Sequence, residues 1–468
     1  MSVFNLLNVG RSAMNATAFG TQTHGQNAAN AATEGYTRRV ARLQPVAPPP
    51  PGGGGARATG ARRKIDPYVE RRLLGARTEQ GGAEARLEVL GGLDLTFADE
   101  SGNVAEALAA FEGSLRELAA YPGDAGAREA VLGRAEALER AFQSAASQLT
   151  GLRDDANDRV QDEVRTLNER LERVASLGNA IARSELSGRE ASDLRDQRDQ
   201  VLRELADQVP LTVLPRDDGQ VTLLLGGTLQ LVDEDGNVSP LGTQVDAATG
   251  DVRVTRTVAG AVQDITDQLA PADGARGRLG GTLEARDGAL AAARAALDQL
   301  AFDLSGAYNA VHAAGIDALG GTGSNLFDPI GAVEGAAASF RVSADVRDQP
   351  ERLAAAQDAT ALPSDDRNAL ALADLAQANT ALGGTATATE AYAALLAQVG
   401  ADVRFARGDL DRTGGLRSQT EALREAVSGV NTDEEMVGLM EFQRAYQASL
   451  RVVQTADEML AELLQLKR

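Results

Sequence analysis

The last predicted helix of the chain carries an apolar stripe that constrains every fold model. In and around MEFQRAYQASLRVVQTADEML (residues 440–460), apolar and small side chains recur at alternating spacings of three and four, which places them on one helix face. The stripe consists of Leu439, Phe442, Tyr446, Ser449, Val453, Ala456, Leu460 and Leu463. The residues after it are too few to fold back over it, so its cover comes from elsewhere.

A second stripe lies near the N-terminus, on a helix predicted over about residues 3–30. Its members are Val3, Leu6, Gly10, Ala13 and Thr17, with Leu7 and Met14 beside them. Gly10 and Ala13 have small side chains, so a partner helix can approach closely at these positions. Gly35 ends the helix, and the following residues, YTRRVARLQP, favour an extended segment.

Three covers for the C-terminal stripe fit the pattern. The chain's own bundle could bury it, a second copy could form a coiled coil with it, or it could join the N-terminal helix in a packed layer of many copies. The third is favoured because the N-terminal stripe is equally uncovered. An isolated helix pair is marginal in water, so we expect residues 1–40 and 430–468 to be disordered in the monomer and to fold on assembly. Head-to-tail contacts of this kind build helical tubes rather than closed dimers.

Long helices dominate the rest of the sequence. A 4-3-4-3 apolar rhythm over residues 160–181 predicts a long helix with a narrow buried seam. The seam consists of Val160, Val164, Leu167, Leu171, Val174 and Ile181. Similar patterns predict one helical bundle domain that is built from residues 65–208, 282–315 and 364–429.

Residues 209–281 interrupt this helical character. Short alternating stretches there are separated by DDG, GG, EDGN and ATGD turns, which predicts a β-rich outer domain. Residues 316–363, with the segment SFRVSADV, are a candidate extension of it. The predicted fold is therefore mainly α with a β insertion: a coiled-coil-like terminal helix pair, an elongated bundle built from both halves of the chain, and a small β-domain in the middle. Because the chain goes out and returns, its two ends should lie together.

Residues 41–64 form a proline- and glycine-rich run that predicts a linker or an exposed loop. A basic cluster overlaps it and continues beyond it: Arg57, Arg62, Arg63, Lys64, Arg71 and Arg72. Two interpretations of this cluster stay open. It is a solvated loop, or it meets acidic neighbours in an assembly.

Composition excludes several classes of function. The net charge of −21 and the pI of about 4.7 disfavour nucleic acid and anionic membrane surfaces as partners. The absence of cysteine excludes disulfides, thiolate catalysis and zinc–thiolate sites. The start of the sequence lacks the features of a cleaved secretory signal, and no apolar run is long enough for a membrane helix. Export by a route that reads another signal stays compatible with these facts.

The sequence offers no constellation of catalytic, cofactor-binding or metal-ligating residues. Its two histidines, His24 and His312, stand outside any paired-ligand spacing, and neither lysine follows a phosphate-binding glycine pattern. The segment DEDGN at 233–237 predicts a tight turn rather than a calcium loop, because no glutamate follows at the required position. These observations indicate a protein that is not an enzyme and binds no cofactor.

Both ends of the sequence resemble the flagellar axial proteins. The resemblance rests on FNLLNVGRSAMNA and GQNAANAATEGYTRRV near the start, and on VNTDEEMVGLMEFQRAYQASLRVVQTADEMLAELLQL at the end. Four internal blocks narrow it to the family of hook-associated protein 1: DLRDQRDQVLREL, GGTLEARDGAL, YNAVHAAGIDALGGTGSNLF and DDRNALALADL. Two departures from the family pattern occur, Gln26-Asn27 for the usual Asn-Asn, and Glu34 in place of proline before Gly35.

The resemblance implies a structural protein of the bacterial flagellum at the junction between hook and filament. It implies secretion through the flagellar type III channel without a cleaved signal peptide. The implied partners are further copies of the chain, hook protein, hook-associated protein 3, and an export chaperone at the C-terminal helix. The implied assembly interface is Val3, Leu6, Leu7, Gly10, Ala13, Met14, Leu439, Phe442, Tyr446, Val453, Ala456, Leu460 and Leu463. The alternative within the class is another axial protein, either hook protein or hook-associated protein 3.

Overall fold

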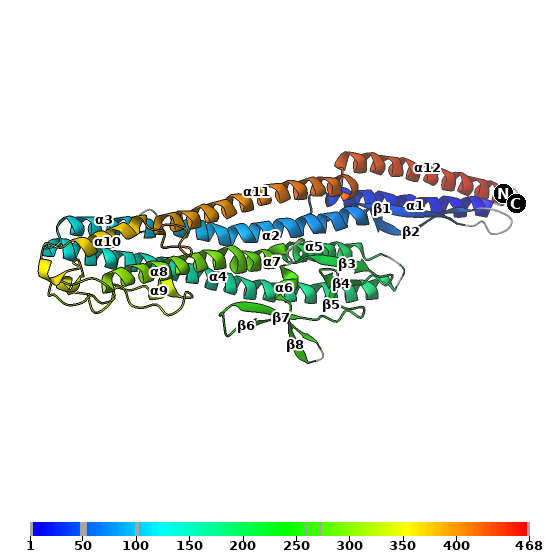
Figure 1. Cartoon of the computed structure of the whole chain (residues 1–468). Coiled ribbons are helices and arrows are strands. Elements are labelled where there is room, and N and C mark those ends of the chain that lie inside the picture. The colour runs from blue at the N-terminus through cyan, green and yellow to red at the C-terminus, as the bar shows by residue number, and fades with distance from the viewer. Residues whose placement is uncertain are drawn as a thin grey trace.

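The computed structural model describes residues 3–46, 54–98, 103–186, 188, 190–258, 260–270 and 274–465. It is an elongated rod of long helices, with small β-sheets along one side (Figure 1). The two chain ends lie beside each other at one end of the rod, as the order of the segments predicts (Figure 1). The predicted class, mainly α with a β insertion, is confirmed.

Helices that run lengthwise build the rod. The terminal pair is α1 (Val3–Ala29) and α12 (Thr432–Gln465). The long helices between them are α2 (Pro67–Ala98), α3 (Val104–Ala120), α4 (Ala125–Glu185), α5 (Ser192–Gln208), α7 (Gly277–Ala285), α8 (Ala291–Ala313) and α11 (Ala388–Ser428). Shorter ones are α6 (Thr266–Leu269), α9 (Ala336–Ser339) and α10 (Arg367–Asp374).

In the described part of the chain, the strands form three small antiparallel sheets. The first is a hairpin of β1 (Arg39–Val46) and β2 (Gly55–Arg63). The other two are meanders in the middle of the sequence. They comprise β3 (Leu211–Pro215), β4 (Val221–Leu225) and β5 (Leu229–Val232), and then β6 (Leu241–Val245), β7 (Val252–Val258) and β8 (Ala261–Asp264).

The helix α4 extends over 61 residues. It begins at Asp124, whose side chain accepts hydrogen bonds from the backbone N–H groups of Gly126 and Ala127 and so caps the first turn. The seam predicted for residues 160–181 is confirmed, because all six of its apolar side chains are buried. Five of them, all except Ile181, belong to one core with residues of α5 and of strands β4 and β5.

Among the described residues, two apolar cores lie one after the other along the rod. The first joins α3, α8, α10 and parts of α2, α4 and α11, and the second joins the rest of α4 with α5, α7 and the β meanders. On α4 the first core ends at Ala156 and the second begins at Val160. A single helix therefore connects both cores without a break.

A π-helical turn at Arg286–Leu290 joins α7 to α8 beside this boundary. Arg286 is one of the largest fully buried side chains of the described residues. Its Nη1 donates hydrogen bonds of 2.8 Å to Oδ1 of Asn157 on α4 and to the carbonyl of Val252 on β7. This arginine therefore ties the helix junction to both α4 and the β-domain.

The structure corrects the linker predicted for residues 41–64. Val40 pairs with Arg62 and Val46 with Gly55, so strand lies on both sides of the proline and glycine run. The tip, residues 47–53, lies outside the described residues. The prolines and glycines of the tip obscured these two strands in the sequence.

The candidate extension of the β-domain at residues 316–363 is also wrong. Val342 makes only an isolated bridge with Phe327, and the ring of Phe340 lies 4.7 Å from that of Phe142 on α4, measured between centroids. Phe340, Val342 and Val346 all belong to the first core. These residues, spaced two and four apart, are buried against helices. They do not form a strand of the outer sheets.

Glu163 on α4 is a buried carboxyl group beside the second core. Its side chain is 14% exposed, and its Oε1 lies 3.8 Å from Nε of Arg278. Its Oε2 has no hydrogen-bond partner among the described residues. Burial raises the pKa of Glu163 to about 7, although Arg278 opposes the shift. Below about pH 7 the folded protein therefore favours the neutral acid of Glu163.

We expect Glu163→Gln to stabilise the protein at alkaline pH. Because the folded pKa is raised, Glu163 contributes stability below its unfolded pKa, and that contribution is lost as the pH rises through about 7. At pH 8 the variant should gain about 1–3 kcal/mol in the free energy of unfolding, and near pH 4 it should match the parent. Urea unfolding at both values measures this. Glu172→Gln, at an exposed position of the same helix, is the control. A gain equal at both pH values would contradict the prediction.

Candidate assembly interface

The terminal helices α1 and α12 pack side by side and antiparallel at one end of the rod (Figure 1). Glycines set their close approach. A methyl group on Gly10 would lie 2.7 Å from Cγ2 of Val453, and one on Gly438 would lie 2.5 Å from Cε1 of His24. A methyl group on Gly20 would overlap the ring of Phe442. Larger residues at these positions would separate the two helices.

The structure places the predicted stripes at this contact but covers them only in part. On α12 only Ser449 and Ala456 of the stripe are buried; Leu439, Phe442, Tyr446, Val453 and Leu460 are half-buried, and Leu463 is exposed. On α1 Gly10 is buried, whereas Val3, Leu6, Leu7, Ala13, Met14 and Thr17 are half-buried. One chain therefore supplies a partner for each stripe and leaves apolar surface open.

Sequence reasoning missed most of the buried seam of α1. Besides Gly10, the buried residues of this helix are Ala16, Gly20, Thr23 and Asn27. They are small or polar, so they add little to an apolar pattern. Their spacing of three, four and six residues is the only signal in the sequence that could have identified them.

A buried carboxylate fixes the start of α12 against α1. Glu435 is fully buried and its Oε2 lies 2.6 Å from Nδ1 of His24 and 2.9 Å from Nδ2 of Asn27, which donates to it. The Nε of Arg38 lies 2.7 Å from Oε1 of Glu435. The carboxylate thus has a partner on α1 and another on the segment that follows α1.

The same asparagine orders that following segment. Oδ1 of Asn27 accepts hydrogen bonds from the hydroxyl group of Tyr36 and the backbone N–H of Arg39, and its Nδ2 donates to the carbonyl of Arg39. Gly35 has a φ of +79°, a left-handed conformation that suits glycine. The chain therefore turns at Gly35, as predicted, and returns along α1 as β1.

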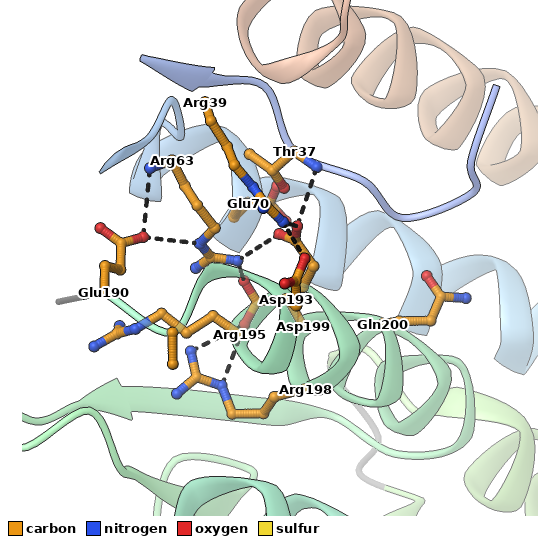
Figure 2. A network of polar contacts seen from close by, with 12 residues as sticks. Thr37, Arg39, Arg63, Glu70, Glu190, Asp193, Arg195, Arg198, Asp199 and Gln200 are labelled. Carbon is orange, nitrogen blue, oxygen red and sulfur yellow. Dashed lines mark hydrogen bonds and ion pairs between the residues drawn. The ribbon is translucent and has the colours of Figure 1, made fainter. Parts of the chain in front are cut away.

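A second polar network joins the β1–β2 hairpin to the bundle (Figure 2). Arg63 of β2 is 3% exposed, and its Nη1 donates hydrogen bonds to Asp196 (2.9 Å) and Asp199 (2.7 Å) of α5. Arg39 of β1 pairs with Asp193, also on α5. The hairpin is thus anchored to α5 through its last arginine and its first.

Protonation in this network follows from its charges. Burial alone would raise the pKa of Asp199, but Arg63 and Arg198 beside it hold that pKa below its ordinary value. Burial opposes the charge on Arg63, yet Asp199 and Asp196 raise its pKa. Asp199 and Arg63 are therefore both charged at neutral pH and form a buried ion pair.

The two histidines have structural partners. His24 contacts Glu435, as described above. His312 lies at the end of α8 with its Nδ1 2.6 Å from the carbonyl of Ser324, and its Nε2 accepts a hydrogen bond from the N–H of Ala354. Burial lowers the pKa of His312. Within the described ranges no group of acidic or histidine side chains has the arrangement of a metal site, and no helix there is long and apolar enough to cross a membrane.

Comparisons with known proteins agree with this architecture. Residues 425–466, which include α12, match the family model of the C-terminal region of flagellar basal body rod FlgEFG proteins. Residues 90–327, just over half of the chain, match the model of the helical domain of the flagellar hook-associated protein FlgK.

Relatives extend over almost the whole chain. Flagellar hook-associated protein 1 of Salmonella typhimurium strain LT2 is 25% identical over 557 residues, covering 99% of this chain and 100% of the relative. The protein of the same name from Bacillus subtilis strain 168 is 26% identical over 499 residues, covering 99% of this chain and 98% of the relative. The flagellar hook junction protein FlgK of Burkholderia pseudomallei has a similar fold, with a TM-score of 0.67 and 17% identity over 76% of this chain and all of that one.

The paired terminal helices and the C-terminal match define the class, a flagellar axial component with a structural role. The helical-domain match then gives the particular family: the chain belongs to the flagellar hook-associated protein FlgK family. The resemblance seen in the sequence is confirmed, and with it the assignment to the flagellum and to motility.

Proposed function

We propose that this protein forms the junction between the hook and the filament, and that it polymerises there through α1 and α12. The supporting observation is the incomplete cover of the terminal stripes. One copy leaves Leu463 54% exposed and Phe4 64% exposed on the terminal helices, beside the half-buried remainder of the stripes. Apolar surface left open on a helix pair is a site for association with another protein surface.

The proposed interface consists of the residues predicted from the sequence on both helices. Those residues lie at one end of the rod and on one helix pair (Figure 1). If α1 and α12 form the inner wall of a tube, the bundle forms the next shell, and the β meanders face outward. Contacts between unlike surfaces of neighbouring copies extend into a helical array instead of closing as a dimer.

We propose that the chain leaves the cell unfolded through the flagellar type III channel, without a cleaved signal peptide. In the free chain, α1 and α12 would be the least stable part, because they contribute to neither of the two cores. An export chaperone would bind α12 and mask its apolar stripe until assembly. Hook protein and hook-associated protein 3 would be the neighbours on either side.

Complementation tests this function. In a bacterium that lacks its own junction protein, the full chain should restore swimming and filament attachment, and a chain shortened by removal of residues 440–468 should restore neither. The shortened chain should keep a folded bundle, since both cores lie outside the removed segment. Circular dichroism of the purified chains and electron microscopy of the cells measure these outcomes.

The controls separate the alternatives. Growth of filament only in cells that lack hook protein, or only in cells that lack hook-associated protein 3, would assign the chain to that other axial position. Swimming supported by the shortened chain would contradict assembly through α12.

A further inference from the structure

The β1–β2 hairpin carries basic and apolar side chains that stay exposed in the single chain. Side chains of a strand alternate between two faces, and the pairing of Val40 with Arg62 places these two residues on one face. Further along the same face Gly55 meets Ser12 of α1, so this face is open only in part. We call five exposed residues of this face the arm face. Its residues are Val40, Arg42, Val46, Arg57 and Arg62, and all five are exposed.

The alternation separates two kinds of arginine. On one face, Arg39 and Arg63 pair with aspartates of α5. On the arm face, Arg42, Arg57 and Arg62 have no ion pair with any described residue, although the chain holds 67 acidic residues against 46 lysines and arginines. The exposed fractions of Val40 and Val46 are 51% and 41%. The arm face therefore combines unpaired positive charge with open apolar surface.

A complementary patch lies on the first turns of α12. Met436, Val437 and Met440 are 50%, 52% and 46% exposed and stand on the side of the helix away from α1. The carboxylates of Asp433 and Glu441 flank them, and neither forms an ion pair with a described residue. We call these five residues the α12 patch. It combines negative charge with flexible methionine side chains that adapt to a partner surface.

Most of the hairpin and α12 pack on different sides of α1 in one chain. The hairpin packs on α1 near Ser12, which meets Gly55, whereas Gly10 and Gly20 of the same helix face α12. In Figure 1 the hairpin lies on one side of α1 and α12 on the other. Within one copy no ion pair between described residues joins the arm face to the α12 patch, and the exposed side chains of both are free for a neighbour.

We propose that the arm face of one copy binds the α12 patch of a second copy. The inference deepens the proposed function and rests on it. Arginines meet carboxylates, and valines meet the two methionines and Val437, so both charge and apolar surface are matched. The arm face and the α12 patch are different surfaces. A copy that binds a neighbour through one of them therefore keeps the other free for a further copy, and the contact can repeat along an array instead of closing as a dimer.

Charge reversal with rescue tests the contact in the full-length chain, expressed in a bacterium that lacks its own junction protein. Arg57→Glu with Arg62→Glu reverses the arm face, and Asp433→Lys with Glu441→Lys reverses the α12 patch. Each pair alone should lower the number of copies found in assembled flagella about tenfold, because like charges then face each other across the interface. The variant with all four substitutions should recover most of the assembled copies, because opposite charges face each other again.

Arg134→Glu with Arg140→Glu is the control. These two arginines of α4 are exposed and have no ion pair among the described residues, so the change in net charge is identical to that of the arm variant. The control should assemble like the parent chain. Circular dichroism and the amount of chain secreted into the medium check that each variant folds and leaves the cell.

The outcomes decide the proposal. Normal assembly of either reversed pair would overturn it, and so would a loss that the fourfold variant does not restore. If the unaltered chain itself fails to restore swimming, the proposed function fails. Self-association of the purified variants at high concentration and low salt then tests the contact alone. The parent chain and the fourfold variant should self-associate more strongly than either variant with one reversed pair.

Discussion

Gly20→Leu should abolish swimming while leaving the rod folded. Gly20 faces the ring of Phe442 so closely that even a methyl group would overlap it. A leucine there would force α1 and α12 apart and expose the carboxylate of Glu435, which is buried one to two turns further along the contact. Neither core contains Gly20, so the free energy of unfolding of the bundle should change by less than about 0.5 kcal/mol. Swimming in cells and urea unfolding of the purified chain measure the two effects.

The same helix offers a matched control for this variant. Gly25 has no other heavy atom within 4 Å of the position of an added methyl group, so Gly25→Leu should support swimming like the parent chain. Adding Phe442→Ala to Gly20→Leu should recover part of the swimming, because the smaller side chain makes room. An equal loss of swimming in Gly20→Leu and Gly25→Leu would mean that a larger side chain anywhere on α1 is harmful. The close contact between Gly20 and Phe442 would then not explain the effect.

Arg63→Met should cause the largest loss of stability among single substitutions in the hairpin. The change leaves Asp196 without its closest cation and Asp199 with Arg198 alone. Removing one partner from a buried ion-pair network costs about 3–5 kcal/mol. Arg62→Met, the neighbour that points to the arm face and has no ion pair, should change stability by less than about 0.5 kcal/mol. Urea unfolding at pH 7 compares them.

The pH dependence gives this prediction a second test. The pKa of Asp199 is held below its ordinary value. A carboxyl group with a lowered folded pKa contributes stability above its unfolded pKa and loses it as the pH falls through the folded one. The parent chain should therefore lose this contribution below about pH 4, whereas Arg63→Met should already lack it at pH 7. If the free energy of unfolding depended on pH in the same way for Arg63→Met and Arg62→Met between pH 7 and pH 3, the stabilisation of Asp199 by Arg63 would be contradicted.

Strong periodic patterns in the sequence predicted the fold well. The spacing of Val160, Leu167 and Val174 identified α4 because a long amphipathic helix buries one stripe whatever its neighbours are. The turns between strands identified the β insertion for a similarly local reason. The failure at residues 316–363 arose because Phe340 and Val342 pack against helices far away in the sequence. A local sequence pattern does not show which distant helix a residue will pack against.

The polar parts of the interface were beyond sequence reasoning for a different reason. Arg62 and Arg63 are adjacent and chemically identical, and only the strand register places one in an ion-pair network and the other on the open face. Glu435 looks like any acidic residue in the first turn of a helix, yet it is fully buried. In each case the decisive fact is which segment lies opposite, and that depends on tertiary structure.

The unbroken course of α4 through both cores has a mechanical consequence. At about 1.5 Å per residue, its 61 residues form a strut of about 90 Å. In the proposed junction, a flexure of the hook that tilts one end of such a strut by a few degrees would displace its other end by several ångström. The outer ends of neighbouring rods would then slide past one another, while each rod keeps its own shape.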